Sequence, residues 1–349
     1  METLTNPALK PGLLTMWRDS QTVQVGVDPR RAVALTGLGR AAVEVLRTLD
    51  GSRDRAGVLA AARARGIPDE AADRVLALLA AGDALDDVPR RVDGSLPLRA
   101  RCRLGPELAT ASLAYRQRDG GSGIIMRRRA SHVRVHGAGR IGSTIACLLA
   151  ASGVGRISCR DPQPAGLADL APAGLHLADV GVPRERGTAR AIRRIAPEAR
   201  TAAGRTRPDL AVLTAPPDPR LIAQLMEEGI PHLAATAGEA IAVVGPLVTP
   251  GHSACIRCID LTRRDRDPGW PLIAAQLAGA EPPVPACDAV LTAAVATQGA
   301  AQALAFIDAA GTGPATRNGT LELVLPDWRW RRRTWTMHDE CGCRRNNIP

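Results

Sequence analysis

The sequence predicts an α/β protein in which a domain with a mainly parallel sheet follows a smaller α+β domain. Two observations lead to this prediction. From residue 131 onward, short apolar runs alternate with helical patterns, as a parallel sheet requires, because each crossover between parallel strands needs a helix. Ahead of this region, two short strands precede three helices. With 349 residues, of which 45% are apolar, the chain is long enough for two separate cores.

The first domain, residues 1–90, has the order of elements that is typical of a winged helix. Residues 21–36 predict two strands that flank a turn. Three helices are then expected, at Arg40–Leu49, Arg55–Arg65 and Asp69–Ala81. From this order we expect a winged-helix-like α+β unit. It would bind an extended peptide beside the strand Thr22–Val27, with the third helix closing the groove.

Residues 91–130 are expected to connect the domains, and residues 131–349 to form the larger one. The predicted strands of the larger domain are Val133–His136, Arg156–Arg160, Leu210–Thr214 and His232–Ala235. The predicted helices are Ser143–Ala151, Thr188–Ile195 and Arg220–Glu228. Near the end of the sequence, Leu321–Leu325 and Trp328–Thr336 predict an antiparallel hairpin.

Charge and cysteine content limit the partners and the compartment. The formal net charge is +10, and Lys10 is the only lysine. Arg on solvated faces explains this charge better than a nucleic-acid surface does, so no nucleic-acid partner is expected. The apolar stretch Ala289–Ile307 contains Thr and Gln, which fit a buried helix better than a membrane span. Residues 1–14 lack the features of a signal peptide, and eight cysteines without such a signal favour the cytoplasm.

A glycine-rich turn follows the first predicted strand of the larger domain. Gly137, Gly139 and Gly142 form the pattern G-x-G-x-x-G, and Asp161 lies about 20 residues further on, at the end of the next strand. In Rossmann-like folds these glycines allow a tight turn, close approach of a phosphate and close packing of the helix on the strand, and the acid binds a ribose. A glycine turn in a fold that binds no nucleotide is the alternative.

Four cysteines form two close pairs. Cys255 and Cys258 have the C-x-x-C spacing, and Cys341 and Cys343 form a C-x-C pair. Four thiolates complete a tetrahedral zinc site without an open position, so the expected zinc is structural. The alternatives are unpaired thiols that fill space and, with less support from the surrounding sequence, a redox pair.

Cys287 immediately precedes the acid that begins the apolar helix. The N–H groups and the dipole at a helix start stabilise a thiolate, which would make Cys287 reactive. The alternative is that Cys287 only packs in the core. Cys147 and Cys159 are expected to be small core residues. No catalytic residue is assigned from the sequence.

Together these features resemble the ThiF family, relatives of ubiquitin-activating enzymes, over about residues 131–349. Enzymes of that family adenylylate the C-terminal carboxylate of a small protein or peptide with ATP and magnesium, usually as dimers. The resemblance implies that Gly137, Gly139 and Gly142 cradle the phosphates and that Asp161 binds the ribose. It also implies a phosphate contact from Arg184, where the family commonly has a Lys.

Several positions depart from the family pattern. The family typically has a second Asp two residues after the ribose acid, where this chain has Gln163. Its N-x-x-R stretch is replaced by Asp169 and Pro172, so the Arg that would stabilise a transferring adenylyl group is missing. Asp218 offers a magnesium ligand behind two prolines, but it fits the start of a helix equally well. The resemblance therefore implies an ATP and magnesium site that is weakened or lost.

The two domains together resemble the leader-peptide-binding cyclodehydratase partner proteins of azole-modified peptide pathways, whose ThiF-like domain is often catalytically silent. They also resemble an actinobacterial ThiF-like group with the same stretch Pro326–Arg333. We therefore expect a homodimeric protein that binds a peptide or small protein and presents it to a partner modifying enzyme. An active ATP-dependent adenylyltransferase is the alternative, and a DNA-binding regulator is a second one.

Overall fold

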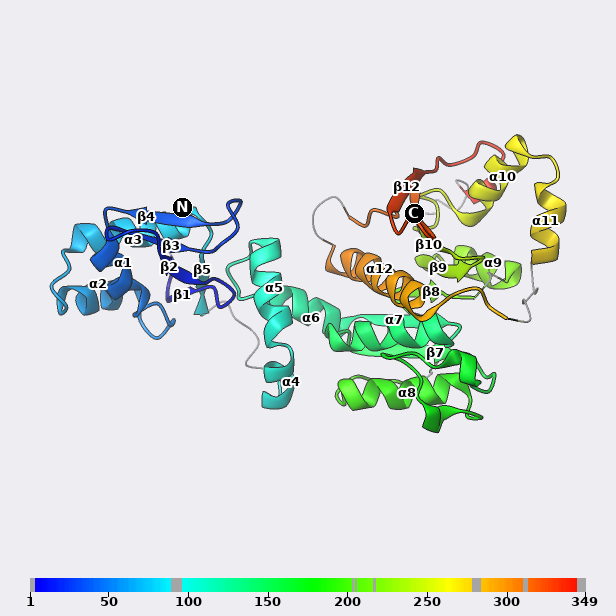
Figure 1. Ribbon diagram of the computed structural model, residues 1–349, viewed down its shortest axis with the longest axis horizontal. Coiled ribbons are helices and arrows are strands. Elements are labelled where there is room, and N and C mark those ends of the chain that lie inside the picture. Colours follow the sequence, from blue (N-terminus) through cyan, green and yellow to red (C-terminus); the bar gives the residue numbers. More distant parts are fainter. Residues whose placement is uncertain are drawn as a thin grey trace. The chain divides into compact units, whose positions relative to one another are not determined.

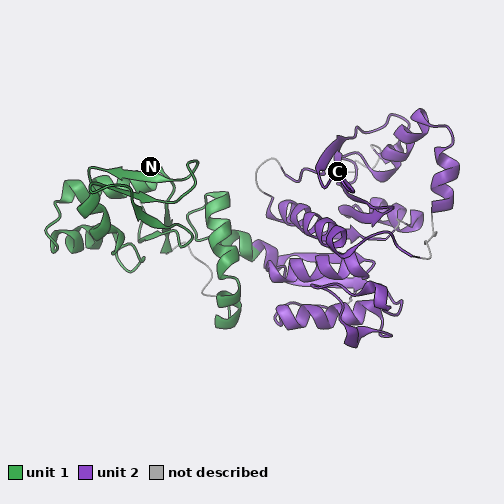
Figure 2. Ribbon diagram, viewed as in Figure 1, with its two compact units in different colours: residues 1–126 green, residues 127–349 purple. Residues whose placement is uncertain are grey.

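The chain folds into two compact units, Met1–Met126 and Arg127–Pro349, in a computed structural model (Figures 1 and 2). Each unit has its own cluster of buried apolar side chains. The structure describes residues 4–88, 96–202, 204, 206–215, 218–277, 284–309 and 313–343.

Unit 1 contains a three-stranded antiparallel sheet in the order β2-β3-β4. Its strands are β2 (Thr15–Trp17), β3 (Thr22–Val25) and β4 (Val33–Thr36). Our expectation of a peptide strand beside β3 is wrong, because β2 and β4 already occupy both edges of β3. Within the described residues, the outer edges of β2 and β4 pair with no further strand, so these are the edges open to a peptide.

Three helices cover this sheet at the predicted places (Figure 1). They are α1 (Gly39–Leu46), α2 (Arg55–Arg63) and α3 (Asp69–Ala81). Apolar side chains at helical spacing, among them Val75 and Leu79 of α3, pack with Leu35 of β4 in the core of the unit. Helix α3 contacts β4 directly. It ends at Gly82, where an added Cβ would lie 2.2 Å from Cγ2 of Val33, so the end of α3 and the start of β4 are in close contact.

Polar contacts join the segment after α3 to the rest of unit 1. Strand β1 (Pro7–Leu9) pairs with β5 (Leu85–Asp87), and helices α4 (Leu98–Arg103), α5 (Gly105–Tyr115) and α6 (Ser122–Ala130) follow. Lys10 is fully buried and donates to Asp83 Oδ2 at 3.0 Å and to the Ser112 carbonyl at 2.9 Å. A buried ammonium needs such partners, because desolvation of an unpaired charge costs several kcal/mol. The only lysine therefore ties the small sheets to α5.

Unit 2 is built on a seven-stranded sheet in the order β12-β11-β10-β9-β8-β6-β7. The strands are β6 (His132–His136), β7 (Arg156–Arg160), β8 (Leu210–Leu213), β9 (His232–Gly238), β10 (Ile241–Val248), β11 (Gly319–Val324) and β12 (Trp330–Thr334). The first four are parallel to one another, which confirms the Rossmann-like prediction, and β10 to β12 extend the sheet in antiparallel fashion.

Helices and 3-10 turns connect these strands. They are α7 (Arg140–Ala151), η3 (Leu167–Asp169), η4 (Leu177–Asp179), α8 (Arg184–Ile195), α9 (Pro219–Glu227), α10 (Ile256–Arg266), α11 (Trp270–Leu277) and α12 (Ala289–Asp308). Among the described helices, α12 alone is long and apolar enough to cross a membrane. Here it packs against α7, β9 and β10, with Leu291 and Val295 fully buried. Asp308 at its end receives two hydrogen bonds from the Arg128 guanidinium, at 2.8 and 2.7 Å.

Candidate functional site

The glycine turn lies between the end of β6 and the start of α7. Gly137 has a φ of +87°, a conformation that a side chain would strain, and its carbonyl accepts a hydrogen bond from Thr214 Oγ1 at 2.9 Å. A Cβ on Gly142 would lie 1.9 Å from the carbonyl oxygen of Gly137. The absence of a side chain at Gly142 therefore lets α7 approach the end of β6 closely enough to form the turn.

Asp161 lies beside this turn, at the end of β7. Its side chain is largely buried, and Oδ2 accepts the backbone N–H of Ala138 at 2.8 Å. Oδ1 accepts the backbone N–H of Gln163 at 3.2 Å. These two hydrogen bonds fix the carboxylate next to the turn, where the resemblance places the acid that binds a ribose.

A second carboxylate, that of Asp169, also reaches the turn. Its Oδ1 lies 3.0 Å from the position that a Cβ on Gly139 would take. Its Oδ2 accepts the backbone N–H of Gly166 at 2.8 Å, which caps η3. From the sequence, Asp169 is only a departure from the family pattern and is not predicted to lie at the turn. The only local signal was the cap spacing from Gly166 to Asp169.

Arg184 bridges the two carboxylates. It is the first residue of α8, and its Nε donates to Asp169 Oδ2 at 2.8 Å, while Nη1 lies 3.5 Å from Asp161 Oδ2. Burial lowers the pKa of Arg184, but the Asp169 and Asp161 carboxylates outweigh burial and raise it overall. Glu185 adds a third carboxylate nearby, which accepts the backbone N–H of Asp161 at 3.1 Å. The positive charge of Arg184 is therefore already paired with carboxylates.

The remaining predicted residues have other contacts. Asp218 caps α9 by accepting the backbone N–H of Arg220 at 2.9 Å, and the two prolines before it lie outside the described residues. Cys287 is buried, and its Sγ lies 3.2 Å from Thr292 Oγ1. Its carbonyl accepts a hydrogen bond from Arg140 Nη1 at 2.8 Å, a contact that joins the start of α7 to the start of α12.

His136, the last residue of β6, precedes the turn directly. Burial lowers its pKa to about 4, and the nearby Arg134 and Arg160 lower it further. The imidazole is therefore neutral at neutral pH and adds no positive charge for a phosphate.

The two cysteine pairs meet in one buried cluster. All four sulfur atoms lie within 4.8 Å of one another, with Cys255 to Cys258 at 3.6 Å, Cys255 to Cys341 at 3.6 Å and Cys258 to Cys343 at 3.5 Å. A tetrahedral metal with metal–sulfur bonds of about 2.3 Å requires sulfur–sulfur separations of about 3.8 Å. The observed separations are close to this value, so the cluster can hold a metal ion that ties α10 to the segment after β12.

The surroundings of the cluster favour negative charge on one sulfur. The hydrogen bond from the Cys255 thiol, together with the backbone N–H of His338, lowers the pKa of Cys258 to about 4. Burial raises the pKa of Cys343 to about 12. The His338 ring turns away from the sulfur atoms and contacts Asp265 Oδ2 at 2.8 Å. A cation at the centre would compensate the cost of bringing further thiolates together.

The family comparison agrees with this geometry. Residues 118–215, which include the glycine turn, Asp161, Asp169 and Arg184, match the model of the ThiF family. A search of the curated proteins finds no match.

Solved structures with the same fold extend beyond the ThiF domain. Escherichia coli MccB with succinimide has a TM-score of 0.70 and 18% identity, over 97% of this chain and 99% of MccB. E. coli MccB with ATP has a TM-score of 0.69 and 17% identity over the same shares. PaaA has a TM-score of 0.61 and 17% identity, over 74% of this chain and 90% of PaaA. The likeness to MccB shows that nearly the whole chain, unit 1 included, shares that fold.

We predict that Gly142→Ala destabilises unit 2 by about 1–3 kcal/mol, because the added methyl group collides with the rigid Gly137 carbonyl. The matched control is Gly139→Ala, where the nearest atom, Asp169 Oδ1, lies 3.0 Å from the added Cβ, so a small shift of that side chain accommodates the methyl group. Thermal unfolding of the full-length variants measures both effects. Equal melting temperatures for the two variants would contradict the proposed role of Gly142.

Proposed function

We propose that this protein binds a peptide through unit 1 and presents it to a partner modifying enzyme, with a ThiF domain whose ATP site is weakened. The observation that carries the proposal is the position of Asp169, whose carboxylate lies against Gly139 and pairs with Arg184. In the family, glycine turns of this kind accept the phosphates of ATP. The Asp169 carboxylate at the turn repels these phosphates. It also pairs with the Arg184 guanidinium, which is the cation best placed to bind them.

The sheet edge of β4 supports the peptide-binding part of the proposal. β4 has an open edge among the described residues and lies against α3, so an extended peptide can pair with its backbone while α3 contacts alternate side chains. Structures of E. coli MccB, which shares the fold, include complexes with MccA and with N-formylated MccA. We transfer the peptide-binding capacity, and not the identity of the peptide, to this chain.

We predict that a bound peptide protects β4 and α3 from hydrogen exchange. Dodecapeptides would be selected by phage display on the immobilised full-length protein, and exchange would be followed by mass spectrometry with and without a selected peptide. The amides of Val33–Thr36 that face the open edge of β4 should slow, because they gain hydrogen bonds to the peptide, whereas those that face β3 are already bonded. The other open edge, Thr15–Trp17 of β2, serves as the internal control. Protection at β2 in place of β4, or failure to select any peptide, would contradict the proposed binding mode.

An active adenylyltransferase is the second candidate, and one observation favours it. E. coli MccB, which shares the fold over nearly its whole length, has been solved with ATP and with AMPCPP. The position of Asp161 beside the glycine turn supports such a site, and Asp218 is the acid that would hold magnesium. Against this candidate stands Pro172, since the missing guanidinium cannot stabilise charge on a transferring adenylyl group.

We predict that Asp169→Asn lowers the dissociation constant for ATP about tenfold, because the change removes one negative charge at the turn and releases Arg184. Asp179→Asn is a closely matched control. Asp179 ends η4, caps His176 in the same way and pairs with Arg190, but it has no recorded contact with the glycine turn. Isothermal titration with Mg·ATP measures both variants.

Pyrophosphate exchange decides between the two candidates. The wild-type protein should show little ATP–pyrophosphate exchange with selected peptides. Robust exchange that is abolished by Asp161→Ala and by Arg184→Ala would make the protein an adenylyltransferase and contradict the weakened site.

We propose zinc as the metal of the four-cysteine cluster, since four thiolates in tetrahedral arrangement suit Zn²⁺. Purified protein should contain about one zinc per chain. Cys341→Ser should release the metal and lower the melting temperature by roughly 5 °C or more. Cys102→Ser is the control, because Cys102 is exposed and lies outside the cluster. If the wild-type protein were purified without metal and Cys341→Ser left its melting temperature unchanged, the proposal would be contradicted.

The DNA-binding candidate finds less support in unit 1. Helix α3, which would be the recognition helix, begins with acidic residues, and Asp69 and Asp73 pair with Arg63 and Arg55 of α2. A recognition helix needs free basic side chains for phosphates.

We further propose that the protein acts in the cytoplasm as a homodimer. None of the eight cysteines forms a disulfide, which fits a reducing compartment, and the dimer follows from the family resemblance.

A further inference from the structure

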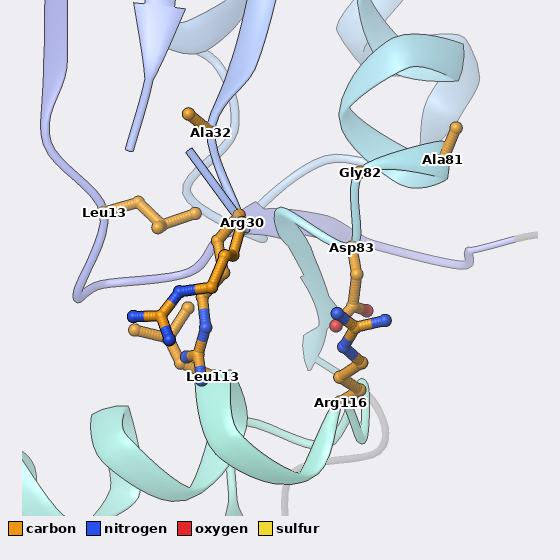
Figure 3. Close-up of a pocket in the computed structure, with 9 residues that line it drawn as sticks. Leu13, Arg30, Ala32, Ala81, Gly82, Asp83, Leu113 and Arg116 are labelled. Atoms are coloured by element: carbon orange, nitrogen blue, oxygen red, sulfur yellow. The ribbon is translucent and has the colours of Figure 1, made fainter. Parts of the chain in front are cut away.

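Unit 1 contains a cavity of about 260 Å³ that none of the features discussed above uses (Figure 3). Three segments that are distant in sequence surround it. Arg30 and Arg31 lie just before β4, Gly82 and Asp83 just after α3, and Arg116 at the end of α5. The cavity is smaller than the 300–1,000 Å³ that is usual for cofactors and drug-sized ligands, so it fits a single side chain better.

The charges around this cavity are mostly positive and partly unpaired. In the described part of the chain, the guanidinium groups of Arg31 and Arg116 form no ion pair with a carboxylate. Arg30 pairs with Asp28 through Nε at 2.9 Å. The only carboxylate in the lining, that of Asp83, is neutralised by Lys10 at 3.0 Å. Two guanidinium groups are thus available to a negatively charged group.

The backbone at the cavity is strained at two residues. Arg116 caps α5 with a φ of +52°, and Asp83 has a φ of +56°. This left-handed conformation favours glycine, especially after the end of a helix, and it costs free energy for a residue with a side chain.

The cavity lies at the end of the β4 edge to which we assign the peptide. Arg31 is two residues before β4, and the contact between Gly82 and Val33 places the end of α3 against the start of that strand. A peptide that pairs along β4 can therefore extend one of its side chains into the cavity. Leu13 and Leu113 in the lining offer apolar surface for the methylene groups of that side chain.

We propose that this cavity is a specificity pocket that takes an aspartate or glutamate side chain of the bound peptide, with Arg31 and Arg116 as its ligands. The pocket rests on the proposed peptide-binding function and narrows its substrate class to peptides with an acidic residue at a fixed position. Two guanidinium groups can hold a carboxylate through several charge-assisted hydrogen bonds, which neutral amides cannot replace.

The test compares dodecapeptides selected by phage display on three full-length proteins: wild type, Arg116→Gly, and the charge-reversed double variant Arg31→Glu/Arg116→Glu. Wild type should enrich Asp or Glu at one position, and the charge-reversed variant should enrich Lys or Arg there. For a wild-type-selected peptide, replacing the acid by its amide should weaken binding to wild type about tenfold or more, and binding to Arg116→Gly much less. Arg116→Gly should melt at the wild-type temperature or above, because glycine relieves the strained cap.

Two outcomes would overturn the pocket alone. Wild type could select peptides that protect β4 from exchange without any acidic preference, in which case peptide binding stands and the pocket is wrong. Alternatively, the preference for an acidic residue could persist unchanged in the charge-reversed variant, in which case residues other than Arg31 and Arg116 bind the acidic side chain. Failure to select any peptide would overturn the peptide-binding function together with the pocket.

Discussion

The candidate nucleotide site depends on one close contact between backbone atoms, that of Gly142 in α7 with the carbonyl of Gly137 at the end of β6. Even one added methyl group at Gly142 would collide with the Gly137 carbonyl, because its Cβ would lie 1.9 Å from the carbonyl oxygen. Because α7 packs so closely, the N–H of Ala138 points at Asp161, and the loop that contains Asp169 can close over Gly139. The geometry of the site thus follows from small residues at the turn, and its chemistry follows from the charged side chains that surround the turn.

These charged side chains show how the same local structure acquires different roles. The tripeptide Leu-Ala-Asp occurs twice within a short distance, and each copy forms a 3-10 turn whose Asp accepts the backbone N–H of the residue before the turn. The Asp179 carboxylate then pairs with Arg190 within α8. The Asp169 carboxylate faces the glycine turn and pairs with Arg184, so it sets the charge that a phosphate would meet. The two carboxylates thus differ in the groups that each one faces and not in the turn itself.

Buried polar and sulfur contacts of high specificity join separate segments within each unit. In unit 1 the buried ammonium of Lys10 joins Asp83 to α5. The same contact neutralises Asp83, the only carboxylate among the residues that line the proposed specificity pocket. In unit 2 the cysteine cluster joins α10 to the segment after β12. Both contacts connect parts of the chain that are distant in sequence. In each case the polar or sulfur groups are buried and need a specific partner. The contact therefore stabilises the fold and also determines which segments pack together.

The sequence by itself determined many of the elements and the residue types of the sites, although it did not predict helices α4, α5 and α6. Helical periodicity located α3 at Asp69–Ala81, the spacing of the glycines located the turn, and the two cysteine pairs predicted a common cluster. These signals are local, because they depend on residues a few positions apart. Only the tertiary structure decided that β3 lies between β2 and β4, that Asp169 closes on Gly139, and that Arg31 and Arg116 border one cavity. Strand order and the approach of distant loops depend on how whole elements pack, and a periodic pattern within one segment carries no information about its neighbours in space.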